Sequence, residues 1–173
     1  MTTGGIYTYF RSKADVFESI VNKVVEEWNS RYEFLLSIAG FEKRIVSFPQ
    51  REQQDSFRSN YHFLVNFINL FRDEMNLLFF KAQGTRFENF SGILAKNVMD
   101  TAKSFLYNNA TINEYSHYRI SDFFLKNIIN FNLNIIREML LKEVSLEEML
   151  NYEEEISSFF NSGWKALLTN YYA

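Results

Sequence analysis

Residues 123–141 read FFLKNIINFNLNIIREMLL, and this stretch decides the fold. Plotted at about 100° per residue, its apolar side chains fall into two neighbouring sectors of an α-helix. The first sector holds Phe124, Ile128, Phe131, Ile135 and Met139, and the second holds Leu125, Ile129, Leu133, Ile136 and Leu140. Together they span roughly 200°, whereas a helix that covers a single core needs an apolar stripe of only about 100°. The stretch is therefore expected to be a helix with an apolar neighbour on two sides.

A second helix with the same surplus follows directly. Its start is marked by Ser145-Leu146-Glu147-Glu148, which has the form of a capping box. In that motif the serine hydroxyl accepts a hydrogen bond from a free amide of the first turn, and the glutamate reaches back to the cap. The predicted helix runs from Leu146 to Asn170. Its apolar arc is similarly wide and contains Tyr152, Ile156, Phe159, Phe160, Gly163, Trp164, Leu167, Leu168 and Tyr171.

The two helices together predict a dimer. Consecutive helices joined by a short turn pack antiparallel, so this hairpin offers one apolar face to its own domain and another outward. Large exposed apolar patches are rare on monomers, and a second copy of the hairpin is the simplest cover, giving a two-fold four-helix bundle. The alternative is a large core within one subunit that covers both faces. The residues expected at the dimer interface are Ile129, Leu133, Ile136, Leu140, Tyr152, Ile156, Phe159, Gly163 and Leu167.

The composition favours one all-α domain. The 173 residues are 47% apolar, 18% aromatic and 23% charged, which is enough apolar surface for a packed interior. One proline and six glycines leave few helix breakers, and alternating strand patterns are missing. Beside a short helix before Phe10, helices are expected over 13–38, 53–82 with a break near 72–73, 86–107, 121–141 and 146–170, with hydroxyl caps at Ser12 and Thr85.

Several classes of protein are excluded by what the sequence lacks. The chain has no cysteine, which rules out a disulfide framework, a thiolate metal site and a cysteine nucleophile. No stretch approaches the roughly 18 apolar residues of a membrane span, and no signal-peptide pattern opens the chain, so a soluble cytoplasmic protein is expected. With 18 basic and 21 acidic residues the net charge is −3, so any contact with DNA must be local.

No catalytic apparatus is visible, and we expect neither an enzyme nor a cofactor. Glycines are scattered rather than gathered into a phosphate-binding loop, and there is no nucleophile elbow. A Glu-x-x-His pair, Glu114 and His117, occurs only once, whereas four-helix di-iron proteins need two copies on separate helices. We therefore expect no metal site, and both His62 and His117 are interpreted as surface or packing residues.

The N-terminal stretch, Thr2 to Phe17, reads TTGGIYTYFRSKADVF. It predicts a very short helix that is capped by a hydroxyl residue, carries small residues for close approach, and is anchored by Tyr7 and Phe10 one turn apart. Ser12 then caps a new helix whose first turn contains Lys13. A short helix that enters a groove, followed by a second helix start beside a cation, suits base recognition together with phosphate contact.

This stretch resembles the end of the DNA-binding domain in the tetracycline-repressor (TetR) family of transcription regulators. The matching positions are Thr2, Gly4, Ile6, Tyr7, Phe10, Ser12 and Lys13. The resemblance implies that residues 1–12 are a remnant of the helix-turn-helix domain and that residues 13–173 form the ligand-sensing and dimerisation domain. Members of the family have two helices before the recognition helix, so this chain is not expected to bind operator DNA tightly. The DNA-binding residues that the resemblance implies are Thr2, Thr3, Gly4, Tyr7, Tyr9 and Lys13.

The resemblance also implies a cavity for a small molecule among the middle helices, and abundant rings there would suit an apolar effector. Plain core packing is the alternative for each ring. Gln83 or Arg86 could orient a polar end of the effector. The expected function is a ligand-responsive regulator, a repressor as is usual in the family; the alternative is a helical homodimerisation or protein-interaction module without a ligand. The expected ligand-binding residues are Phe63, Phe67, Phe71, Phe79, Gln83, Phe87, Phe124 and Phe131.

Overall fold

The computed structural model describes residues 9–36, 61–108 and 120–169. All regular secondary structure in these ranges is helical, and no strand occurs among them. The all-α class predicted from the sequence is confirmed. The helices are α2 (Lys13–Leu36), a helix at residues 61–70, α5 (Arg72–Phe80), α6 (Phe90–Asn108), α7 (Asp122–Leu141) and α8 (Leu146–Thr169).

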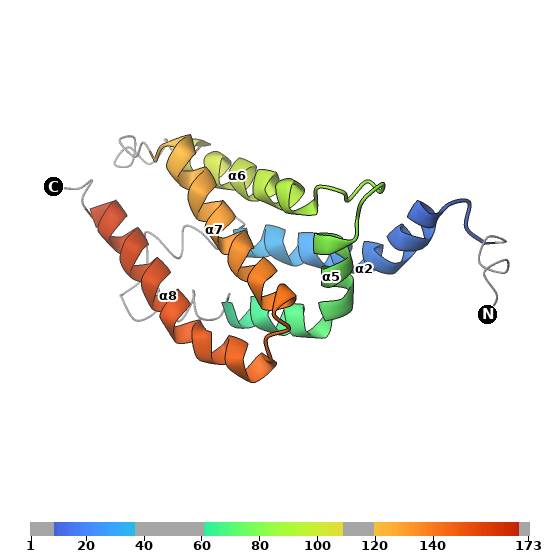
Figure 1. Ribbon diagram of the computed structural model, residues 1–173. Coiled ribbons are helices and arrows are strands. Elements are labelled where there is room, and N and C mark those ends of the chain that lie inside the picture. Colours follow the sequence, from blue (N-terminus) through green and yellow to red (C-terminus); the bar gives the residue numbers. More distant parts are fainter. Residues whose placement is uncertain (1–8, 37–60, 109–119, 170–173) are drawn as a thin grey trace.

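The predicted break in the 53–82 helical run falls at Phe71. This residue leaves helical geometry, with φ −114° and ψ 33°. Backbone hydrogen bonds nevertheless continue across it, from its own amide to the Phe67 carbonyl at 3.0 Å and from the Met75 amide to its carbonyl at 2.8 Å. The chain therefore turns between the two helices without losing its backbone bonds (Figure 1). Residues 53–60 and the short helix expected before Phe10 lie outside the described residues, Tyr9 excepted.

Two of the three predicted caps are confirmed. The Ser12 hydroxyl accepts from the Asp15 amide at 3.1 Å, and Asp15 in turn accepts from the Arg11 amide at 2.9 Å. At α8 the Ser145 hydroxyl accepts from the Glu148 amide at 3.2 Å, and the Glu148 carboxylate accepts from the Ser145 amide at 3.0 Å. Hydrogen bonds from the backbone and then the side chain of Ser145 lower the pKa of Glu148. Both helix starts therefore follow from local side-chain chemistry.

The third predicted cap, Thr85, is not a helix start. Its hydroxyl accepts from the amide only two residues ahead, at 3.1 Å, which closes a tight turn instead of capping a first helical turn. Gly84 precedes it with φ +77°, a left-handed conformation that glycine adopts without strain. Helix α6 begins at Phe90, where the Asn89 side chain accepts from the amide of Gly92 at 3.2 Å. The segment 81–89 is thus a loop.

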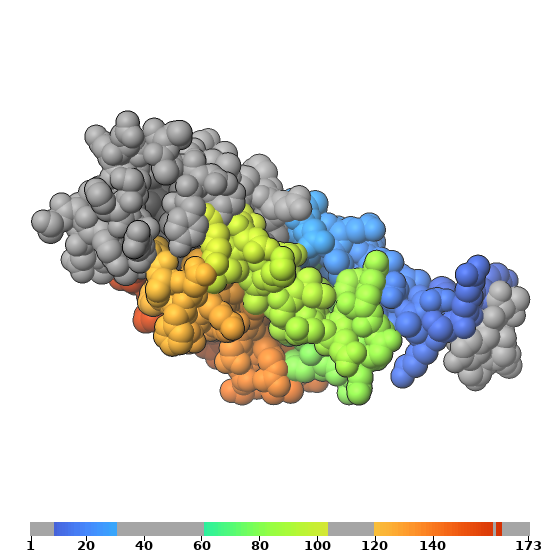
Figure 2. Space-filling model, turned by 90° about the horizontal axis from the view of Figure 1, so that it is seen from above, coloured from blue at the N-terminus to red at the C-terminus, as the bar shows by residue number. Residues whose placement is uncertain are grey.

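The helices pack around one continuous apolar core. Helix α7 runs beside α6 and also contacts α5, while α2 contacts α5 and α6. The first turns of α2 extend past the other helices at one end of the molecule, as Figures 1 and 2 both show. The side chains with the least exposure come from five of the six helices and are Val21, Val24, Val65, Ile68, Met75, Leu78, Leu140 and Met149.

Helices α7 and α8 form the antiparallel hairpin that was expected (Figure 1). The turn between them is fixed from outside the hairpin, because the Arg72 guanidinium at the start of α5 donates to the Val144 carbonyl at 2.6 Å. Within the turn, Glu143 adopts φ +51°. The hairpin is therefore anchored to the core at its closed end.

Candidate functional site

The residues expected to contact DNA are only partly described. Thr2, Thr3, Gly4 and Tyr7 lie outside the described residues. Tyr9 is 79% exposed, and Lys13 is an exposed residue at the first position of α2. Figure 2 shows this end of α2, in blue, extending from the body of the molecule. A cation at an accessible helix start is compatible with phosphate contact, and the role of these residues in DNA binding stays a prediction.

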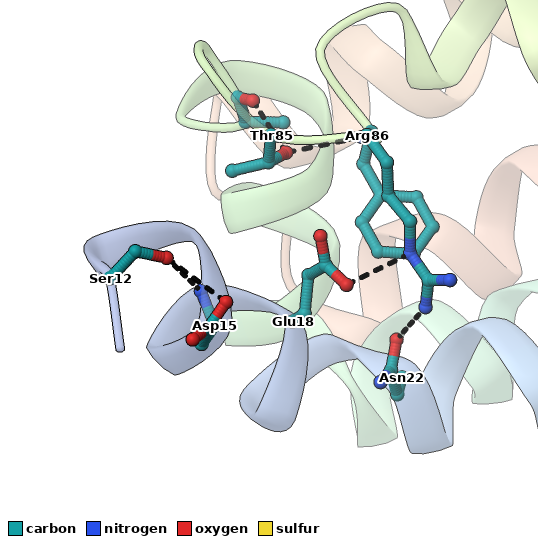
Figure 3. A network of polar contacts seen from close by, with 8 residues as sticks. Ser12, Asp15, Glu18, Asn22, Thr85 and Arg86 are labelled. Carbon is teal, nitrogen blue, oxygen red and sulfur yellow. Dashed lines mark hydrogen bonds and ion pairs between the residues drawn. The ribbon is translucent and has the colours of Figure 1, made fainter. Parts of the chain in front are cut away.

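Arg86 joins the 81–89 loop to the N-terminal half of α2. Its Nε atom lies 3.1 Å from Glu18 Oε2, and its Nη2 atom donates to Asn22 Oδ1 at 2.5 Å (Figure 3). The guanidinium also lies over the Phe87 ring, 4.7 Å from its centre. The loop and the helix are thereby held together by a charged, a polar and a cation–π contact. Gln83, the other polar residue considered for an effector, is exposed on the same loop.

The rings expected to bind a ligand fall into three groups. Phe63, Phe67 and Phe71 stack along one helix face, with centre-to-centre distances of 5.8 and 4.8 Å, and Trp28 of α2 meets Phe67 edge-on at 5.2 Å. In the second group, Phe79 and Phe87 both pack against Phe90, at 5.7 and 6.3 Å. The first two groups belong to the core and its margin. A ligand among them stays a prediction.

The third group lies on the surface and changes the interpretation of α7. Phe124 and Phe131, expected to line a cavity, are exposed, Phe131 at 47%. Ile129, Leu133, Ile136 and Leu140, expected at a dimer interface, are buried inside a single chain. The Leu–Ile sector of α7 therefore covers the subunit's own core, and the Phe124 and Phe131 rings of the other sector face outward. The rest of that sector does not, since Met139 is buried and Ile135 is partly buried against the core. Helical periodicity separates the two sectors but does not say which one faces the core.

Helix α8 carries an outward stripe that matches the one on α7. On α7 the stripe consists of Phe124, Ile128, Phe131 and Ile135, and on α8 of Tyr152, Ile156, Phe159 and Gly163, each with spacings of four, three and four residues. Phe159 is 62% exposed and its ring lies 6.1 Å from that of Phe131. An added Cβ at Gly163 would meet nothing within 4 Å, so the surface stays open at this end. Leu167 lies in α8 among the residues whose side chains are not described.

We call these eight residues the outward stripe of the hairpin. Its four rings are exposed, whereas Ile128, Ile135 and Ile156 are partly buried, and the last two pack against the core. The polar side of α7, opposite these apolar residues, is exposed to solvent, with Lys126, Asn130 and Asn134 exposed. Apolar residues spaced alternately four and three apart are the pattern that packs helices side by side, each side chain entering a gap on the facing helix. A surface of this kind on both arms of a hairpin suits contact with another pair of helices.

A second feature of α8 was not anticipated from the sequence. Its inward stripe, Met149, Glu153, Ser157 and Phe160, is buried, yet the middle two side chains are polar and each is only 6% exposed. Glu153 Oε2 lies 3.3 Å from His62 Nδ1, on the helix at residues 61–70. The signal was present in the sequence, because Glu153 and Ser157 fall at helical spacing between the apolar residues Met149 and Phe160.

The environment of Tyr61 reflects this buried carboxylate. Tyr61 is itself buried, and its hydroxyl lies 4.0 Å from the Met139 sulfur of α7. Burial raises the pKa of the Tyr61 hydroxyl, and the negative charge of Glu153 followed by that of Tyr152 raises it further. The phenol stays protonated at neutral pH and donates to the Met139 sulfur.

Two further findings concern other site types. Within the part of the chain that the structure describes, no three histidine, cysteine, aspartate or glutamate side chains lie close enough together to hold a metal ion. Glu114 and His117 lie outside that part. None of the described helices has a run of apolar residues long enough to cross a membrane.

No protein-family model, curated protein or solved structure matches the chain. The likeness to the TetR family therefore rests on the residues of the N-terminal motif alone. It leads to a proposal of function and not to an assignment of family.

Proposed function

We propose that the chain is the sensor and dimerisation part of a ligand-responsive transcription regulator of the TetR type, acting as a repressor. The observation that carries the proposal is the outward stripe of the hairpin. Its exposed rings are not needed to cover the core of their own subunit. Contiguous exposed apolar patches of this kind mark sites of association with another molecule. The N-terminal motif supplies the link to DNA.

The occupant that fits the outward stripe is a second copy of the same hairpin. A two-fold axis places identical stripes face to face, so a surface that interdigitates with its own spacing is self-complementary. Two hairpins joined in this way form a four-helix bundle. The stripe contains no charged side chain, which suits the centre of a lasting interface.

The same arrangement gives a route from effector to DNA. The first turns of α2, which contain the last residues of the N-terminal motif, extend from the body of the molecule (Figures 1 and 2). The 81–89 loop is tied to this helix by Arg86, through Glu18 and Asn22 (Figure 3). In the proposal, an effector among the middle helices shifts this loop, and the shift moves the N-terminal end of α2 in both subunits of the dimer.

Sedimentation equilibrium at micromolar concentration tests the proposal. A dimer is expected, and a folded monomer would overturn it. The alternative, a homodimerisation module without a ligand, is favoured by the close ring contacts around Phe67 and Phe90. Quenching of Trp28 fluorescence by added apolar compounds separates the two functions, because Trp28 packs against Phe67. Trp28→Phe is the matched control, since it keeps the packing and leaves only the signal of Trp164.

A further inference from the structure

The outward stripe has an acidic outer edge on α8, on the side that points away from α7. The Phe160 ring lies 5.9 Å from the Phe131 ring of α7, so the side of α8 that carries Phe160 is turned toward α7. At helical spacing, Glu148, Asn151 and Glu155 fall on the other side of the stripe, and all three are exposed. The border of the apolar surface on α8 therefore offers hydrogen-bond acceptors and negative charge.

The outer edge of α7 has the opposite character. Asn130 and Asn134 are exposed and fall on the side of the α7 stripe that lies away from the buried Met139. Lys142 follows Ile135 by seven residues, which is two helical turns, so it continues the line of the stripe just beyond the end of α7. Its side chain is 70% exposed. Amide and ammonium groups donate hydrogen bonds, so α7 offers donors where α8 offers acceptors.

Two identical hairpins can stack face to face about a two-fold axis in two ways. When the axis crosses the helices, each helix lies on its own copy, and the outer edge of α8 meets the same edge of the partner. Glu148 and Glu155 of both subunits then share one edge, and such like-charge contacts disfavour association. When the axis runs along the helices, α7 lies on the partner's α8, and the acidic edge meets the donor edge of α7. The charges therefore favour the second arrangement.

The second arrangement also brings complementary groups to the same level. An axis that runs along the helices leaves every residue at its own height along that axis. The ring contacts between α7 and α8 fix the relative height of the two antiparallel helices (Figure 1). With a rise of about 1.5 Å per residue, Asn134 is level with Glu155 to within about 3 Å, and Lys142 is level with Glu148 to a similar extent. Each carboxylate on the edge thus meets a donor from the other subunit.

We propose that α7 of one subunit packs on α8 of the other, with Asn134 facing Glu155 of the partner subunit and Lys142 facing Glu148 of the partner subunit. This inference rests on the proposed function, because it specifies how the second copy docks on the outward stripe. The exposed rings of the stripe supply the apolar centre of the interface, and the two edges fix which helices meet.

Cysteine cross-linking tests the arrangement, because the chain contains no cysteine of its own. Three variants are compared, Asn134→Cys, Glu155→Cys and the double variant with both changes, each treated with bis(maleimido)ethane, a short thiol cross-linker. Both positions are exposed, so the substitutions should leave the fold intact. Covalent dimers on a denaturing gel are expected mainly from the double variant. Efficient cross-linking of Glu155→Cys alone, or none of the double variant, would overturn the proposal.

The direction of a charge effect gives a second test. Glu155→Gln keeps the shape and removes one charge from the edge, and sedimentation velocity at low ionic strength measures the association. In the proposed arrangement the dimer should weaken about twofold to fivefold, as for other exposed ion pairs and charge-assisted hydrogen bonds. Glu154→Gln is the matched control, since Glu154 is exposed on α8 but lies outside the stripe and its outer edge. It should leave the association unchanged.

The competing arrangement predicts the opposite sign. With α8 on the partner's α8, Glu155→Gln removes a like-charge repulsion, so the dimer should become tighter. A tighter or unchanged dimer would therefore contradict the proposal. The two proposals also fail separately. A dimer with a different cross-linking pattern would leave the regulator proposal standing and exclude this arrangement, whereas a folded monomer would exclude both.

Discussion

Helix α8 exposes large apolar side chains on its outward side and buries polar side chains on its inward side, whereas most helices at a protein surface do the opposite. Its outward side shows large apolar residues, with Phe159 at 62% exposure, while its inward side buries a carboxylate and a hydroxyl, Glu153 and Ser157. On α7 the inward side is wholly apolar and the outward side also carries rings. Scattered apolar residues on a surface are common, but an exposed apolar patch and a buried polar group are each informative. Both occur on one helix here.

The contrast separates two roles of the same hairpin. The inward side of α7 contributes to the stability of the single chain, because its side chains leave water only on folding. The exposed rings of the outward stripe contribute less in that way and are proposed to contribute on association. On the inward side of α8 the buried Ser157 hydroxyl, which has no hydrogen-bond partner, disfavours folding relative to an apolar side chain of similar size. Substitutions on each surface should therefore change different measurements.

The largest effect is expected for Leu140→Ala on the inward side of α7. Leu140 is 1% exposed, and truncating a buried leucine leaves a cavity that lowers the free energy of unfolding by about 2–5 kcal/mol. Urea unfolding followed by circular dichroism, at several protein concentrations so that association can be separated from folding, measures it.

Leu141→Ala is the matched control, since the neighbouring leucine is 55% exposed and its loss should change the unfolding free energy by about 0.5 kcal/mol or less. If Leu140→Ala left the stability of the folded chain unchanged and instead dissociated the dimer, the inward sector would be the interface after all, as the sequence pattern first indicated.

The sequence predicted the two apolar sectors of α7 but not which of them faces the core. The helices, the break at Phe71 and the caps at Ser12 and Ser145 were predictable because each depends on residues within one or two turns. Thr85 has the local sequence pattern of a helix cap although no helix begins there. Only the turn at Gly84 distinguishes it from a true cap. The face of α7 that meets the core depends on helices distant in sequence, which periodicity does not specify.

The candidate site was less predictable than the fold. The contact between Glu153 and His62 depends on the position of the helix at residues 61–70, which brings His62 and Tyr61 beside α8. Glutamate in a helix is exposed far more often than buried, so the sequence pattern alone predicts that Glu153 is exposed to solvent. Phe124 and Phe131 were attributed to a cavity because rings are common there, whereas their surface position depends on how α7 packs.

The next effect in size is expected for Phe159→Asp on the outward stripe. A carboxylate placed at the centre of a paired apolar surface should weaken association by about a hundredfold or more, as for other central interface residues. The variant should remain folded, because Phe159 is 62% exposed in the single chain. Sedimentation equilibrium measures the association, and Ser158→Asp, on the exposed side of the same turn, should leave the dimer intact. A dimer that survives Phe159→Asp would place the interface elsewhere.

The smallest effect is expected for Ser157→Ala, and the informative result is whether the free energy of unfolding rises or falls. Alanine has the higher helix propensity, by a few tenths of a kcal/mol, and this gain is shared by Ser158→Ala on the exposed side. The difference between the two variants therefore isolates the consequence of burial. Because the Ser157 hydroxyl is buried without a partner, its removal should raise the unfolding free energy by up to about 1 kcal/mol more than Ser158→Ala does. If Ser157→Ala were instead the less stable of the two, the Ser157 hydroxyl would already be hydrogen-bonded in the folded protein.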